Sequence, residues 1–191
     1  MTGRDILQME LTGSLNLLQE RIQAVSDQEW SARAIPEGNM LGFTLWHTAR
    51  IIDWGIHCAI QGVPEVADRP EWRRLLASEA AYGAGIPAEL AARVAKSVSR
   101  EDVGGYLGAV RLAGLAWLKD VNEADLDRVP DLYEHQQANP RYVDPAVWAE
   151  VSSLAGLPAW HILARPCIMH IRLHIGEIDL TLQAVRARAT A

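Results

Sequence analysis

The chain has 191 residues, of which 49% are hydrophobic and 22% are charged, a balance typical of a globular protein with one sizeable core. The formal net charge of -6 argues against a nucleic-acid-binding protein, which would carry a basic face. Two cysteines, Cys58 and Cys167, are too few for a disulfide framework or a cysteine-based zinc motif. No stretch has the apolar length of a signal peptide or a membrane span, so we expect a cytoplasmic protein without membrane partners.

Helical periodicity dominates the first part of the chain. Residues 4–25 place apolar side chains at spacings of three and four, which predicts an amphipathic helix. Ser26 and Glu29 have the spacing of a capping box for a short following turn. A second helix is expected from about residue 43 to residue 61, with Gly62 as its C-terminal glycine.

The middle of the chain alternates between helix and turn signals. Residues 88–98 are rich in alanine and are predicted to be helical. Ser99 and Asp102 mark the start of a third long helix, over residues 103–121. Residues 123–143 carry two prolines and many polar groups, and we expect a loop there.

The last part of the chain predicts two more helices. Asp144 and the proline after it start a short helix that stops at Gly156. Pro158 starts the last long helix, which continues to about residue 188 with a kink at Pro166. No strand-like alternation is present. The sequence therefore predicts an all-α four-helix bundle with extra short helices in the connections. We expect one domain over residues 1–191, with residues 123–150 as an inserted loop or short-helix region.

The stretch "CIMHIRLHIGEI" places His170 and His174 four residues apart in an apolar run. On a helix such residues differ by about 40° around the axis, so both imidazoles project from one face and can bind one ion. The pair is equally compatible with two hydrogen-bonded core histidines. A third ligand must come from another helix, and His47 in "GFTLWHTARIIDW" is the best candidate, because it lies among apolar side chains one turn into the second helix. His161 faces away from His170 on the same helix.

These segments resemble a known family. "TLWHTARIIDWGIHCAIQG" followed by "HIRLHIGEI" is similar to the DinB/YfiT-like superfamily of bacterial four-helix-bundle proteins, many of which are described as metalloenzymes. The resemblance covers roughly residues 5–120 and 155–188. It implies a divalent metal, zinc or nickel, held by His47, His170 and His174, with water or substrate in the remaining positions.

The resemblance also carries expectations about activity. Relatives include bacillithiol and other thiol transferases and the mycothiol-dependent maleylpyruvate isomerase, and relatives form homodimers. Glu177 stands where the family commonly has glutamine. Its carboxylate could orient a ligand, act as a catalytic base, or form a salt bridge.

A three-histidine site has the layout of a catalytic centre, because a structural zinc ion is closed by four protein ligands. An open position can lower the pKa of bound water to about 7 or hold a thiol as thiolate. We therefore expect a metal-dependent transferase or hydrolase for a small-molecule substrate, with a low-molecular-weight thiol as one candidate. The alternative is a non-enzymatic, stress-related or partner-binding bundle whose metal is incidental or absent.

Four further residues have two interpretations each. Cys167 lies one turn before His170 and could be a fourth ligand or a nucleophile, or a buried small side chain. Arg50 and Asp53 could hydrogen-bond a ligating imidazole, or form an ion pair near the bundle surface. His135 could belong to a loop that covers the site, or to a solvated loop.

Overall fold

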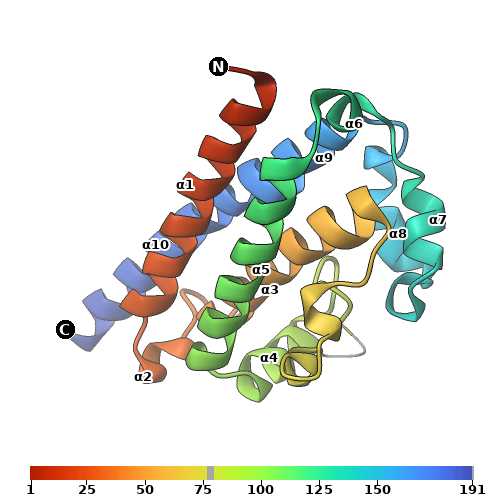
Figure 1. Ribbon diagram of the computed structural model, residues 1–191. Coiled ribbons are helices and arrows are strands. Elements are labelled where there is room, and N and C mark those ends of the chain that lie inside the picture. Colours follow the sequence, from red (N-terminus) through yellow and green to blue (C-terminus); the bar gives the residue numbers. More distant parts are fainter. Residues whose placement is uncertain (77–79, 191) are drawn as a thin grey trace.

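The computed structural model describes residues 1–76 and 80–190, and these residues form helices and connecting turns without a strand (Figure 1). Four long helical segments account for most of the structure. They are α1 (Gly3–Ala24), α3 (Leu41–Asp53) with its π-helical continuation η1 (Trp54–Gln61), α5 (Arg100–Asp120), and α9 (Ala159–Ala164) continued by the π-helix η6 (Arg165–Met169) into α10 (His170–Ala189). The four long helices expected from the sequence are therefore all present.

The four segments enclose one core. Helix α1 packs against α5 and α10, and α3 packs against the same two helices from the other side. Apolar residues recur at helical spacing on α1, and Leu11, Leu15, Leu18 and Ile22 are all buried. Every residue of α3 is buried, because its sequence is apolar around almost the whole circumference. Polar side chains on α3 are therefore enclosed, and each needs a partner.

Local signals set the helix boundaries. Ser26 and Glu29 form the predicted capping box, which starts α2 (Asp27–Trp30). Gly62 ends the second long segment with a φ of +64°, a conformation that glycine adopts at little cost. The Ser99 hydroxyl accepts a hydrogen bond from the Asp102 N–H at the start of α5. These predicted caps are confirmed.

The connection between α5 and α9 is more ordered than expected. It contains α6 (Glu123–Asp127), α7 (Leu132–Gln137), the 3-10 turn η4 (Pro140–Tyr142), α8 (Pro145–Val151) and η5 (Ser152–Leu154). The prediction of a loop over residues 123–143 is therefore wrong. The short helices that were expected in the connections are observed. The cause is capping by Asn122 and Asp131 together with the burial of apolar side chains such as Leu132. The remaining elements are α4 (Ala88–Ser97) and the 3-10 turns η2 (Val66–Asp68) and η3 (Arg73–Leu75).

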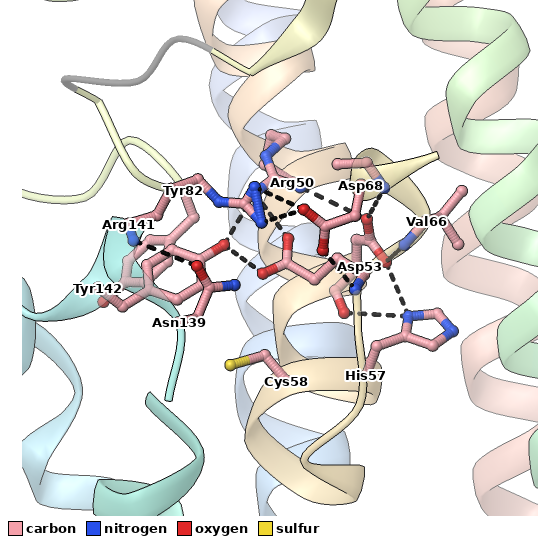
Figure 2. Close-up of polar contacts among 12 residues, drawn as sticks. Arg50, Asp53, His57, Cys58, Val66, Asp68, Tyr82, Asn139, Arg141 and Tyr142 are labelled. Carbon is pink, nitrogen blue, oxygen red and sulfur yellow. Dashed lines mark hydrogen bonds and ion pairs between the residues drawn. The ribbon is translucent and has the colours of Figure 1, made fainter. Parts of the chain in front are cut away.

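A network of buried charges ties neighbouring segments to α3. Arg50 forms ion pairs with Asp53 at 3.4 Å and with Glu65 at 2.7 Å, and all three side chains are fully buried. Arg50 also donates hydrogen bonds to the hydroxyls of Tyr106 and Tyr142, both at 2.8 Å. Figure 2 shows Arg50, Asp53 and Tyr142 converging beside α3. Charges buried at this depth need partners, so removing one member of the network would leave another charge buried without compensation.

Asp53 is the centre of a second set of contacts. Its carboxylate accepts hydrogen bonds from the N–H groups of Val66 and Ala67 at 3.0 and 2.9 Å, and His57 Nδ1 lies 2.7 Å away. Burial alone would raise the pKa of Asp53, but the hydrogen bond from His57 and the charge of Arg50 hold it below its usual range. Of the two interpretations of Arg50 and Asp53, the structure shows the ion pair. Its expected position near the bundle surface is wrong, because α3 is enclosed on every side.

None of the helices in residues 1–76 and 80–190 combines the length and the apolar character that a bilayer-spanning segment needs.

Candidate metal centre

Three histidines from two helices meet at one point. His47 comes from α3, and His170 and His174 come from the first two turns of α10. Their ring nitrogens lie within 4.8 Å of one another. His170 Nε2 lies 3.1 Å from His47 Nε2 and 3.1 Å from His174 Nε2. The structure thus brings together all three ligands that the sequence resemblance implies.

The outer ring nitrogens have fixed partners. His47 Nδ1 lies 2.6 Å from the carbonyl oxygen of Tyr82, and His174 Nδ1 lies 2.7 Å from the Glu177 carboxylate. Carbonyl and carboxylate oxygens only accept hydrogen bonds, so both Nδ1 atoms must carry a proton and donate it. When the rings are neutral, the Nε2 atoms of His47 and His174 then carry lone pairs. This arrangement of a protonated outer nitrogen with an acceptor is the usual support of a metal-binding imidazole.

The inner nitrogens are poorly satisfied by one another. His170 Nε2 faces two lone pairs at 3.1 Å, and a neutral ring can offer at most one proton to both of them. A cation between the three nitrogens would satisfy all of them. Two ligands of a tetrahedral zinc ion, with Zn–N bonds of about 2.0 Å, lie roughly 3.3 Å apart, close to the two observed separations. The three side chains therefore fit a divalent metal ion.

Burial keeps two of the imidazoles, His47 and His170, in their ligand form. Desolvation, with a further contribution from His174, lowers the pKa of His47 to about 3. Desolvation and His174 also lower the pKa of His170 to about 4. Both rings are therefore neutral at neutral pH, and metal binding does not have to displace protons from them.

The carbonyl partner of His47 sits in a tightly wound turn. Ala81 has a φ of +48° and Gly83 a φ of +95°, so Tyr82 lies between two left-handed residues. The Tyr82 ring packs on Trp54 at 4.9 Å between centroids, and its hydroxyl donates a hydrogen bond to the Val147 carbonyl at 3.0 Å. Sequence reasoning missed this contact, because a backbone carbonyl leaves no residue-type signal. The glycine-containing stretch "AAYGAG" was the only available indication of a turn.

A cavity of about 330 Å³ opens beside the histidines and is lined by His47 and His170. Its walls are mainly apolar, with Ile51, Trp54, Leu154, Met169 and Leu173 among the lining residues. The volume lies at the lower end of the range typical of small-molecule sites. A ligand in this cavity would reach the open side of the histidine cluster.

No family model matches the chain, and no curated protein is similar to it. The interpretation of the site therefore depends on its own geometry.

Glu177 lies on the outer side of the cluster. Its carboxylate contacts Nδ1 of His174, and its side chain is 41% exposed. This contact is the one expected of a residue that orients a ligand or pairs with it. The carboxylate does not line the cavity, so the geometry gives no support to a role as catalytic base.

Cys167 does not belong to the cluster. It is fully buried, and its thiol packs so closely on α3–η1 that a Cβ at Gly55 would collide with the sulfur. Burial raises the pKa of this thiol well above its usual range, which makes it a poor nucleophile and a poor ligand. Of the two interpretations of Cys167, the structure supports the buried side chain.

His135 lies on the ordered helix α7, away from the cluster. Its Nδ1 lies 3.1 Å from the carbonyl oxygen of Ala59 in η1, and its ring is partly buried. Both expectations for His135, a loop that covers the site and a solvated loop, are therefore wrong. The Asp131 cap and the burial of Leu132 explain why this segment is helical.

Proposed function

We propose that this protein is a metal-dependent enzyme whose site is formed by His47, His170 and His174. Zinc is the first candidate ion and nickel the second. The main support for this proposal is that imidazole nitrogens from two helices converge on one point. The Nδ1 atoms of His47 and His174 are in addition held by fixed hydrogen-bond acceptors. In this proposal the chain is a four-helix bundle of the DinB/YfiT-like type, and the cytoplasm is its location.

The residues of the chain have distinct roles in this proposal. A divalent ion held by three imidazoles supplies a Lewis acid that makes a nucleophile available at neutral pH. Tyr82 and Glu177 keep two of the imidazoles in the tautomer that binds metal. The apolar walls of the cavity exclude water from the reacting groups and hold the substrate against the open side of the cluster.

The nucleophile would come from outside the chain. Both cysteines are buried, and burial raises the pKa of Cys58 to about 12 and that of Cys167 further. Neither thiol lines the cavity beside the histidines. The nucleophile is then water or the thiol of a small molecule, so we propose a hydrolytic or thiol-transfer reaction.

The alternative function, a partner-binding bundle, is favoured by one observation. Leu173 and Leu180 on α10 are 74% and 68% exposed, and Met169 just before them is 60% exposed. Exposed apolar side chains of this size often mark a contact with another chain. We propose a homodimer as the simplest such contact. Light scattering of the wild type and of a Leu173→Glu variant tests this proposal, which fails if the wild type is a monomer at micromolar concentration.

Metal content tests the main proposal. Protein purified without a histidine tag should contain close to one equivalent of divalent metal per chain. A His170→Ala, His174→Ala double variant should lose it, because two of three ligands are removed. His161→Ala is the matched control, since His161 lies in the same continuous segment but outside the cluster. Less than about half an equivalent, unchanged in the double variant, would contradict the proposal.

A further inference from the structure

An arginine, Arg165, lines the cavity beside the histidines. Arg165 is the first residue of η6, and its side chain is exposed at the cavity wall. Among the residues that the structure describes, no carboxylate or hydrogen-bond acceptor contacts its guanidinium. Most other arginines of the chain do have such a partner, as Arg50, Arg141 and Arg172 illustrate. An unpaired guanidinium at a cavity is available to a ligand.

The π-helix explains why Arg165 lines the same cavity as His170. The His170 N–H donates to the Arg165 carbonyl, a bond across five residues. In an α-helix, residues five apart lie about 140° apart around the axis, so Arg165 would face away from His170. A bond across five residues widens the turn and brings the two close to one face. Pro166, which lacks an N–H, favours this departure from α-helical geometry.

The rest of the cavity limits what Arg165 could bind. Glu150 of α8 also lines it and also has no ion-pair partner within the described ranges. Its carboxylate lies against Gly85, where a side chain would collide with it. The remaining walls are mainly apolar. A cavity with one cation, one anion and apolar walls suits a small ligand that has an apolar body and a single negative charge. A second negative charge on the ligand would be repelled by Glu150.

We propose that Arg165 binds the carboxylate of the substrate, and that the substrate class is a small carboxylate with an apolar body. Guanidinium matches the planar carboxylate with two parallel N–H donors. The substrate would lie with its carboxylate at Arg165 and its body along Trp54 and Leu154, next to His47 and His170. This inference rests on the proposed function only in taking this cavity as the substrate site.

Hexanoate and 1-hexanol are suitable probes, because they share the same chain and differ in charge. Binding is measured by NMR titration of the isotope-labelled full-length protein, once after treatment with EDTA and once with one equivalent of zinc. Arg165→Gln removes the cation. Glu150→Gln is the matched control, since it removes the other charge of the same cavity. Arg165→Lys keeps the charge but not the two parallel donors.

We expect hexanoate to bind the EDTA-treated protein, with shifts at residues that line the cavity, and 1-hexanol to bind at least about fivefold more weakly. Arg165→Gln should remove that difference, Arg165→Lys should keep part of it, and Glu150→Gln should bind hexanoate as well as the wild type or better. Equal hexanoate binding by the wild type and Arg165→Gln would overturn the inference. If hexanoate binds only with zinc and independently of Arg165, the inference fails and the metal site stands. If zinc does not bind but the Arg165 effect is present, the proposed function fails and the inference stands.

Discussion

Replacing Gly83 by alanine should disturb the metal centre through the turn that holds His47. A Cβ at Gly83 would lie 2.9 Å from Trp46 and 3.1 Å from His47 Nδ1. Trp46 is fully buried and cannot move aside. The left-handed φ of +95° costs an alanine about 1–2 kcal/mol, and forcing side chains apart in a packed core adds about 1–3 kcal/mol. We expect the metal-free variant to lose about 2–5 kcal/mol of unfolding free energy.

Gly156→Ala is the matched control for this variant. Gly156 has a similar φ of +80°, but no atom lies within 4 Å of an added Cβ. Urea denaturation should therefore show a loss of only about 1–2 kcal/mol for the control. Because Gly83→Ala also displaces the Tyr82 carbonyl from His47, its zinc affinity should fall about 10- to 100-fold, while the control keeps wild-type affinity. Equal destabilisation by the two variants, with zinc affinity unchanged in both, would refute this reasoning.

Three further variants test other parts of the structure. Arg50→Met leaves the buried Glu65 carboxylate without its ion pair. Urea denaturation should show a loss of about 3–5 kcal/mol in unfolding free energy. A loss below about 1 kcal/mol would show that the buried network does not stabilise the fold. Glu177→Gln replaces a charged acceptor of His174 by a neutral one, and should weaken zinc binding about tenfold in competition with a chelator dye, with unfolding free energy of the metal-free protein nearly unchanged. Glu29 has its pKa lowered from 4.5 to about 2, chiefly by the hydrogen bond from an arginine of α10, so its contribution to stability is complete above pH 4.5 and is lost as the pH falls toward 2. The wild type should therefore lose more stability than Glu29→Gln over that interval, and parallel pH profiles would contradict the assignment.

Helix positions and histidine spacing could be read from the sequence because both depend on local periodicity. A separation of four residues places His170 and His174 on one face of any helix. The apolar surroundings of His47 indicated a buried side chain that needs a partner, and the structure places it against His170. The caps at Ser26 and Ser99 were predictable for the same local reason.

What the sequence did not reveal depends on tertiary packing. Arginine is a residue type usually found at the surface, so nothing in the sequence indicated that Arg50 is buried. Its burial follows from the position of α3 at the centre of the molecule. Tyr82 supports His47 through its backbone, which no residue type encodes. Arg165 and Glu150 line the same cavity only because a π-turn and a long connection place them there. These contacts join segments far apart in the chain, so periodicity gives no information about them.

A crystal structure of the zinc-loaded, untagged protein, with anomalous data collected at the zinc edge, would show directly whether the three histidines bind a metal ion. We expect one strong anomalous peak per chain, bonded to the Nε2 atoms of His47, His170 and His174 at about 2.0–2.1 Å, with its open side toward the cavity. No peak at this cluster, or a peak held by other residues, would contradict it.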